Sequence, residues 1–320
     1  MEKGKGPGPR LPFSIVDVFT HEPLSGNPLA IVADAQGLDE ATMQRIAREF
    51  NESETTFLLP ATRLEAHWRL RSFTPTGVLE AHWRLRSFTP TGVEVFGADH
   101  NALGAWWWLV ESGRLAVTGP VTLFVQEIGD RQLPVEIRSS GGELTAIGMM
   151  QTPPSFGATC GTMPELASAL ELPEADLAMN DGLPAQVVST GAAHLLVPVQ
   201  NRAAVVRARP HAERLASLLA TVAGQGCYLF CLDPINPAAT AHARFFNPTV
   251  DIWEDPATGS AAGPLACHLV ARGVVEDGTT IFVEQGHAMG RPSQIEVRVR
   301  DREVRVLGSA VVVAEGTLGL

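Results

Sequence analysis

The hydrophobic positions of the first sixty residues predict short strands around one amphipathic helix. Residues 38–49 place their apolar side chains on one face of a helix, with Asp39 near its start. Asn51 follows as a residue that readily ends a helix. Patterns typical of strands occur at 13–19, 28–33 and 57–60.

Two later segments are apolar all round, which is the pattern of a helix buried inside a core. Residues 101–112 include Trp106, Trp107 and Trp108 and are followed by Gly113, a suitable C-terminal cap. Residues 263–272 form the second segment. We therefore expect two central helices, and we expect the tryptophans to be core residues rather than a stacking platform.

The rest of the chain predicts an α+β fold of two similar lobes. Each lobe is a curved, mostly antiparallel sheet or barrel around a central helix. A polar, proline-rich stretch at 152–164 predicts the crossing between lobes. The predicted organisation is a disordered tail at 1–10, an N-terminal lobe at 11–152 and a C-terminal lobe at 153–320, and whether the final strands return to the N-terminal lobe stays open. Further elements are strands at 121–125, 135–138, 185–189, 194–199 and 227–232, a helix at 210–222, and three strands within 281–314.

A tandem duplication interrupts the N-terminal lobe. Residues 64–78 read LEAHWRLRSFTPTGV, and residues 79–93 repeat those fifteen letters unchanged. Two identical copies indicate a recent duplication or an error in the gene model, because solenoid repeats diverge and need several copies. Each copy alternates as one half-buried strand does. We expect the second copy to take the strand's place in the sheet and the first to bulge outward or form an extra edge.

Composition and charge narrow the function. The chain has 320 residues, 45% of them hydrophobic, and a formal net charge of −11. Its length predicts two lobes of about 150 residues each. The negative charge and the absence of a basic stripe disfavour nucleic acid as a partner. No apolar run is long enough to span a bilayer, so we expect no membrane partner either.

The four cysteines favour a reducing compartment, so we expect a cytoplasmic protein. They are scattered between residues 160 and 267, without the spacing of a disulfide framework. Cys227 and Cys231 lie in an apolar run that is more typical of a buried strand than of a metal site. We accordingly predict no metal and no other cofactor. The four are Cys160, Cys227, Cys231 and Cys267.

Three short segments place ionisable groups beside tight turns and helix starts: residues 51–55, 97–101 and 254–261. In the third, Pro256 restrains the chain after Asp255, and the glycine-rich run 259–263 opens an apolar helix. Free backbone N–H groups near Ser260 would therefore face a carboxylate. His100 stands at the equivalent place before the first central helix. Taken singly, Asp255, His100 and Glu54 are each better explained as cap or surface residues.

Taken together, the motifs resemble the PhzF-like family of phenazine-biosynthesis isomerases. The resemblance covers nearly the whole chain from Phe13, and the segment 254–263 is its most specific part. It implies the two-lobed fold of diaminopimelate epimerase, usually a homodimer, with a cofactor-free active site between the lobes. The motifs are VDVFT at 16–20, GNP at 26–28, MQRIA at 43–47, SET at 53–55, FTP at 88–90, EDPATGS at 254–260, QG at 285–286 and GRPS at 290–293.

The resemblance also implies roles for particular residues. Glu54 matches the family's proton-transferring carboxylate, His100 its histidine, and Asp255 its aspartate. Burial raises the pKa of a carboxyl group, which suits it to take a proton from one carbon and return it to another. The type reaction is isomerisation of trans-2,3-dihydro-3-hydroxyanthranilate, a small carboxylate. The expected substrate-binding residues are Ser260, which matches the family's serine, and its neighbours Thr258, Gly259 and Ala261, with Asn101.

One departure from the family pattern is Asp99, which precedes His100 where a small residue is usual. We expect its carboxylate to raise the pKa of His100 or to crowd the turn. Rival functions remain at this point. A two-base racemase of the same fold has cysteines where this chain has Ala98 and Thr258, which disfavours that mechanism. An inactive binding or scaffold homologue stays open, and a hydrolase is disfavoured because Ser260 lacks a GxSxG elbow.

Overall fold

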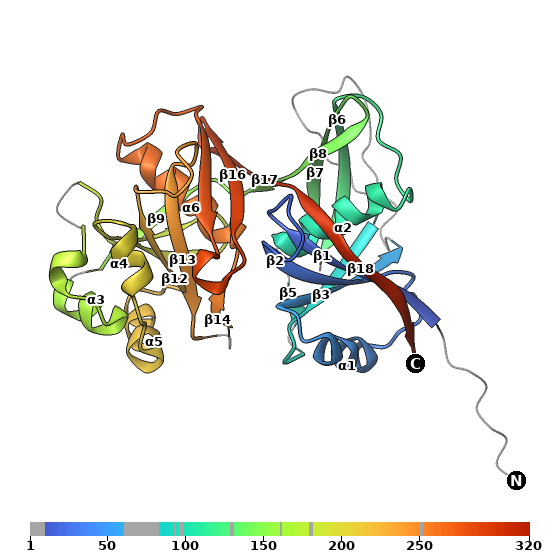
Figure 1. Ribbon diagram of the computed structural model, residues 1–320, viewed down its shortest axis with the longest axis horizontal. Helices are drawn as coiled ribbons and strands as arrows, with labels where there is room; N and C mark the ends of the chain where they lie inside the picture. Colours follow the sequence, from blue (N-terminus) through green and yellow to red (C-terminus); the bar gives the residue numbers. More distant parts are fainter. Residues whose placement is uncertain are drawn as a thin grey trace, which may run out of the picture. The chain divides into compact units, whose positions relative to one another are not determined.

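The computed structural model describes residues 10–60, 83–92, 94–95, 99–128, 131–160, 162–178, 182–249 and 252–320 (Figure 1). The chain divides into two compact units. Unit 1 consists of Met1–Leu24, Pro28–Met149 and Ser309–Leu320, and unit 2 of Ser25–Asn27 and Met150–Gly308. The chain therefore returns to unit 1 at its C-terminal end.

Unit 1 is a mostly antiparallel sheet with two helices. The C-terminal strand β18 pairs antiparallel with β1, so both ends of the described chain lie in the same sheet (Figure 1). The elements are β1 (Arg10–Val18), β2 (Asn27–Val32), α1 (Glu40–Phe50), β3 (Glu54–Pro60), β4 (Trp83–Phe88), β5 (Glu94–Val95), α2 (His100–Glu111), β6 (Val121–Ile128), β7 (Arg131–Ser140), β8 (Glu143–Gln151) and β18 (Ala310–Gly319).

Unit 2 is also a sheet packed against helices, and its described residues form more helices than those of unit 1. Its elements are β9 (Ser155–Thr159), α3 (Met163–Leu170), η1 (Glu174–Asp176), β10 (Gln186–Ser189), β11 (Ala193–Pro198), α4 (Arg202–Arg207), α5 (Ala212–Thr221), β12 (Gly226–Cys231), β13 (Ala241–Asn247), β14 (Ile252–Asp255), α6 (Gly259–Ala271), β15 (Thr280–Gln285), η2 (His287–Met289), β16 (Ser293–Arg300) and β17 (Glu303–Gly308). Each η element is a single 3₁₀ turn.

The two units share one topological pattern around a central helix. In unit 1, β2 pairs parallel with β3 and β4 pairs parallel with β6, while β3 and β4 are antiparallel. In unit 2, the pairs β11–β12 and β13–β15 are parallel, while β12 and β13 are antiparallel. A parallel pair needs a crossover connection, which α2 supplies between β4 and β6 and α6 supplies between β13 and β15. The predicted α+β class with two similar lobes is confirmed.

The central helices are buried on nearly every side, as their composition predicts. In α2, every residue from His100 to Leu109 is buried, including the three tryptophans. Helix α2 packs closely on strands β1 and β2 at Gly104, where an added Cβ would lie 2.7 Å from the side chain of Leu29 and 2.8 Å from that of Val18. A larger residue at that position would push the helix outward. The glycine therefore fixes the depth of α2 in the sheet, and with it the position of His100.

Residues at its two ends define the bounds of α1, as the sequence predicts. The side chain of Asp39 accepts a hydrogen bond from the backbone N–H of Thr42, and Asn51 adopts the left-handed conformation at φ 53° to end the helix. Buried residues of α1, such as Met43 and Ile46, pack into a core cluster with Phe57 of β3. The helix thus covers one part of the unit 1 sheet through its apolar face.

Two sequence-based expectations for the second half of the chain were wrong in detail. The stretch 152–164, expected to be a crossing, contains β9, which pairs with β10. The tail forms four strands, β15 to β18, where three were expected. In both cases long-range strand pairing extends the regular structure beyond what local propensity favours. Helix α6 begins at Gly259, at the start of the glycine-rich run 259–263 that was expected to open it, and it includes Pro264.

The second copy of the repeat supplies a strand of the sheet, as predicted. Strand β4 lies within 79–93, pairs antiparallel with β3 and parallel with β6, and places Ser87 opposite Thr56. The first copy, at 64–78, lies outside the described residues. No described helix has both the length and the apolar character needed to cross a membrane.

Candidate active site

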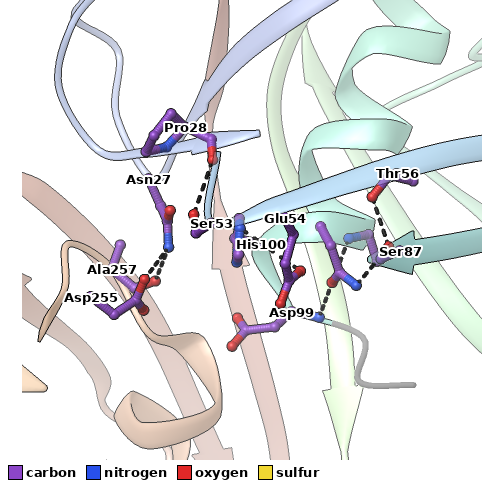
Figure 2. A network of polar contacts seen from close by, with 12 residues as sticks. Asn27, Pro28, Ser53, Glu54, Thr56, Ser87, Asp99, His100, Asp255 and Ala257 are labelled. Carbon is purple, nitrogen blue, oxygen red and sulfur yellow. Dashed lines mark hydrogen bonds and ion pairs between the residues drawn. The ribbon is translucent and has the colours of Figure 1, made fainter. Parts of the chain in front are cut away.

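In unit 1, the start of β3 brings a carboxylate close to the start of α2. Oε2 of Glu54 lies 3.9 Å from Nε2 of His100 (Figure 2). The two side chains are only 12% and 7% exposed. This separation exceeds a hydrogen bond, so a small shift or an inserted substrate atom could bridge the two groups. Sequence reasoning named both residues, and the fold brings them together.

Burial sets the charge of His100. Its removal from water lowers the pKa of the imidazole to about 4, so the ring is neutral at physiological pH. The expectation that Asp99 raises this pKa was wrong, because desolvation outweighs any attraction by the neighbouring carboxylate. Nε2 of His100 has no hydrogen-bond partner among the described residues. A neutral imidazole in this position can donate to or accept from a substrate.

The turn before α2 is held by a short chain of side-chain hydrogen bonds. Nδ2 of Asn101 donates to Oγ of Ser87 at 3.1 Å, and that hydroxyl lies 2.7 Å from Oγ1 of Thr56 (Figure 2). Oδ1 of Asn101 accepts from the backbone N–H groups of Asp99 and Ala102. Asn101, expected to bind substrate, is thus buried and fixes the backbone on both sides of His100.

In unit 2, Asp255 lies at the end of β14 within a dense set of hydrogen bonds. Oδ1 accepts from Nδ2 of Asn27 at 2.8 Å (Figure 2). Oδ2 accepts from the hydroxyl of Thr258. Asn27 also donates to the carbonyl of Ala257 at 2.9 Å. The carboxylate is 8% exposed. These donors stabilise its charged form and fix its orientation.

Gln285 is a central member of this set whose role the sequence did not reveal. Its Nε2 donates to the backbone carbonyl of Asp255 at 2.6 Å and to the hydroxyl of Thr258 at 3.0 Å. Its Oε1 accepts from the hydroxyl of Tyr228 at 2.8 Å and from the backbone N–H of Thr258 at 3.2 Å. The glutamine is fully buried. The QG motif at 285–286 was the available signal, but only the fold places it against the 255–258 loop.

The glycine of that motif permits a close approach of backbone to backbone. Gly286 has φ 81°, and an added Cβ would lie 2.1 Å from the carbonyl oxygen of Arg291 and 2.6 Å from that of Pro256. Only glycine fits both the conformation and the space. The turn after β15 therefore packs directly on the loop that holds Asp255.

The start of α6 groups the other expected substrate-binding residues. Thr258 caps the helix, Gly259 and Ser260 form its first turn, and Ala261 is fully buried. The first backbone N–H groups of a helix lack partners within the helix and carry partial positive charge, which suits a substrate carboxylate. Ser260 is partly exposed, so its side chain can reach solvent.

Gln151 braces the first turn of α6. Its Nε2 donates to the carbonyl of Gly259 at 3.0 Å, and its Oε1 accepts from the hydroxyl of Thr190 at 2.6 Å. A Cβ at Gly263 would lie 1.9 Å from that same oxygen. The glycines of α6 therefore make room for a side chain that locks the helix start.

Two buried or half-buried arginines, Arg244 and Arg291, have structural partners. Arg244 forms a two-point ion pair with Glu254 at 2.8 and 2.9 Å and also donates to the backbone carbonyl groups of Val205 and Ala208. Arg291 donates to the carbonyl groups of Ser25 and Gly26. Both guanidinium groups are therefore held by groups of unit 2.

The cysteines are unsuited to a two-thiol racemase. All four are buried and free, and burial raises the pKa of Cys227 and of Cys267 to about 12, far from the thiolate form. Ala98, one of the two positions compared with racemase cysteines, lies outside the described residues. In the described part of the chain one group of side chains, His242, Glu284 and His287, is close enough to hold a metal ion, and no cysteine belongs to it.

Comparison with known proteins identifies the family. A family model described as phenazine biosynthesis-like protein, PhzC-PhzF, matches residues 16–81 and 78–316. The chain belongs to this family. Each matched stretch contains one copy of the fifteen-residue repeat, 64–78 in the first and 79–93 in the second.

Relatives match over almost their full length. A Pseudomonas chlororaphis protein named trans-2,3-dihydro-3-hydroxyanthranilate isomerase is 33% identical, covering 96% of this chain and 99% of its own. An uncharacterized isomerase of Mesorhizobium japonicum is 32% identical, covering 96% and 98%. The crystal structure of a PhzF-family phenazine biosynthesis protein from Bacillus anthracis covers 97% of this chain and 99% of its own, with a TM-score of 0.82 and 28% identity. The chain is an isomerase of the PhzF family.

Proposed function

We propose that this isomerase moves a proton between two carbons of a small carboxylate, and that trans-2,3-dihydro-3-hydroxyanthranilate is the substrate to test first. The relative from Pseudomonas chlororaphis is named for that reaction. The observation that most supports proton transfer here is the near-buried pair of Glu54 and neutral His100. The overall change is an isomerisation, so one proton leaves a carbon, one returns elsewhere, and a double bond moves.

Glu54 is the proposed proton carrier. A carboxylate in a largely water-excluded position can remove a proton from carbon and then, as the acid, return it to a second carbon. His100 would stabilise the enol-like intermediate by hydrogen bonding while remaining neutral, which its pKa of about 4 favours. Asn101 would keep the histidine in place through its bonds to Ser87 and to the flanking backbone.

Asp255 and the start of α6 are the proposed binding elements. The fixed carboxylate of Asp255 would accept a hydrogen bond from an amino or hydroxyl group of the substrate. The backbone N–H groups at Gly259 and Ser260, together with the Ser260 hydroxyl, would receive the substrate carboxylate. Thr258 would act through Asp255, since its hydroxyl donates to Oδ2 of that residue.

The direct test is an assay with trans-2,3-dihydro-3-hydroxyanthranilate beside a Glu54→Gln variant, followed by absorbance. Turnover by the wild-type chain that is lost in the variant supports both the substrate and the role of Glu54. Turnover that survives in the variant contradicts that role. No turnover in either protein rejects this substrate, and a panel of small 2-amino acids then tests the epimerase alternative by change of optical rotation.

Two further properties follow as proposals. The four buried, free cysteines support a cytoplasmic location, where thiols stay reduced. A homodimer is proposed from the family resemblance alone. Light scattering of the purified chain at several concentrations decides it, because a monomer mass throughout rejects the dimer.

A further inference from the structure

A second cluster of polar side chains lies in unit 2, apart from the residues given a role above. His242 comes from β13, Glu284 from β15 and His287 from the 3₁₀ turn η2. One donor atom from each residue lies within 4.8 Å of the others. The parallel pairing of β13 and β15 places His242 directly beside Glu284 in register, 42 residues apart in sequence. The fold, not sequence spacing, assembles the group.

The carboxylate of this cluster is buried and lacks a cationic side chain. Glu284 is 3% exposed and accepts from the backbone N–H groups of Ile235 and Asn236 at 2.8 and 2.5 Å. Among the described residues its single ion-pair partner is His242, whose Nδ1 lies 3.1 Å from Oε2. Burial lowers the pKa of that histidine, and its hydrogen bond to Glu284 partly opposes the shift.

His287 completes the set with an unused nitrogen. Its Nδ1 is buried and has no hydrogen-bond partner in the part of the chain that the structure describes. Its ring centroid lies 5.1 Å from that of His242. An imidazole nitrogen hidden from water without a partner is costly, and a bound cation would remove that cost.

The donor set suits a particular class of ion. Two imidazoles and one carboxylate are typical ligands of Zn²⁺ and similar divalent transition metals, whereas Ca²⁺ and Mg²⁺ prefer oxygen donors alone. Tetrahedral zinc ligands lie about 3.3 Å apart, so the donors need to close by a small side-chain rotation. His287 is partly exposed on a single turn between Gly286 and Gly290, which leaves it free to make that adjustment.

We propose that His242, Glu284 and His287 form a binding site for a divalent transition-metal ion, with Zn²⁺ as the probe. Gln285, which braces Asp255 and Thr258, lies in the chain between two of the proposed ligands, Glu284 and His287. A metal there would fix the turn at 286–290 without taking part in proton transfer. The proposal stands on this cluster alone and does not depend on the proposed reaction.

The test is metal binding by the full chain without a polyhistidine tag, after removal of metals with a chelator. Titration with Zn²⁺ by calorimetry should give one site per chain, and Co²⁺ should give visible absorption bands typical of mixed nitrogen and oxygen ligands. His287→Ala should weaken Zn²⁺ binding by at least about 10-fold, because one of three ligands is lost. His21→Ala, at an exposed histidine in unit 1, should bind as the wild type does.

A second variant separates ligand loss from disturbed folding. Glu284→Gln keeps an acceptor for the backbone N–H groups but removes the charge, and it should also weaken Zn²⁺ binding. Zn²⁺ should raise the melting temperature of the wild type and of His21→Ala, but not of His287→Ala. The proposal is overturned if the wild type binds no Zn²⁺, or if His287→Ala binds it with unchanged affinity and spectrum.

Discussion

Near the start of each central helix an ionisable side chain is buried, His100 at α2 and Asp255 at α6, but the polar groups around the two side chains differ. At α2, Nε2 of buried His100 has no hydrogen-bond partner among the described residues, and the carboxylate of Glu54 is 3.9 Å away. Just before α6, the carboxylate of Asp255 accepts hydrogen bonds from Asn27 and Thr258, and its backbone carbonyl accepts one from Gln285. The first arrangement retains bonding capacity for a reacting group, while the second fixes a carboxylate rigidly. In the proposed function, the same crossover topology supports a proton-transfer site near α2 and a binding site near α6.

The cost of burial explains why the two differ. A buried histidine avoids that cost by staying neutral, so it needs no ion pair. A buried aspartate that stays charged needs hydrogen-bond donors, and the side chains of Asn27 and Thr258 supply them. We therefore expect substitutions near the start of α2 to affect the chemical step, and substitutions near the start of α6 to affect the orientation of the substrate.

The largest expected effect is from Glu54→Gln. The amide keeps the size of the side chain but cannot carry the proton, so kcat should fall by about 10³-fold or more. Steady-state assays on the preferred substrate measure it. Glu49→Gln, an exposed glutamate in α1, is the matched control and should keep full activity. A variant at Glu54 with kcat within a few fold of the wild type contradicts the proposed roles.

Asp255→Asn should cost less. The amide loses the charge but keeps an acceptor toward Asn27, so we expect a fall of about 10²-fold in kcat/KM through weaker substrate orientation. Separate values of kcat and KM distinguish a loss of substrate orientation from a loss of the chemical step. Urea unfolding shows whether the variant remains folded. An unchanged kcat/KM in a folded variant would remove Asp255 from the site.

The buried histidines should make stability depend on pH. The pKa of His100 and of His194 is about 4 in the folded chain against 6.5 for an ordinary histidine. The unfolded chain therefore binds more protons between these values, and stability is lost as pH falls from 6.5 to 4. Each histidine should contribute about 2 kcal/mol of this loss between pH 7 and pH 5. Urea unfolding of His194→Gln should show a shallower pH dependence, and an unchanged slope would contradict the burial account.

Gln285→Leu should have a smaller effect on activity. The loss of the bonds to Asp255 and Thr258 loosens the carboxylate without removing it, so kcat/KM should fall by about 10-fold. Tyr228→Phe removes one hydrogen bond to the same glutamine and should cost less still. Gln285→Glu should not recover the activity, because a carboxylate keeps the acceptor for Tyr228 but lacks the N–H groups that donate to Asp255 and Thr258. Equal activity of Gln285→Leu and the wild type would reject a positioning role for Gln285.

The smallest expected effect is from deleting residues 64–78. Strand β4 comes from the second copy, so its pairing with β3 and β6 does not require the first. Residues 61–63 and 79–82 would remain to connect β3 with β4, a length common for such loops. Melting temperature and kcat should match those of the full chain. A variant that fails to fold would mean that the first copy takes part in the sheet.

Elements set by local chemistry were predictable from the sequence. The side chain of Asp39 caps the first turn of α1, and Asn51 ends the helix in the left-handed conformation. The apolar run at 101–112 predicts a buried helix, which the structure contains. The start of α6 was not predictable in the same way. Gly259, Gly263 and Pro264 are poor helix formers, and tertiary contacts such as the bond from Gln151 to Gly259 hold the first turn.

The site was predictable in parts for the same reason. Glu54, His100 and Asp255 belong to short motifs whose resemblance to one family is visible in the sequence. Gln285 acts on a loop 30 residues earlier in the chain. His242 and Glu284 meet only because β13 and β15 pair in parallel. Long-range strand pairing, which sequence patterns do not encode locally, creates both of the features that were missed.

The central claim is that proton transfer depends on Glu54 while Asp255 orients the substrate. The most direct measurement is a single turnover in heavy water, with enzyme in excess, followed by mass spectrometry of the product. Because Glu54 returns the abstracted proton while largely shielded from water, we predict product with little deuterium from the wild type, the same low label per turnover at a lower rate for Asp255→Asn, and no product for Glu54→Gln. Product formed by Glu54→Gln at the wild-type rate would contradict the account.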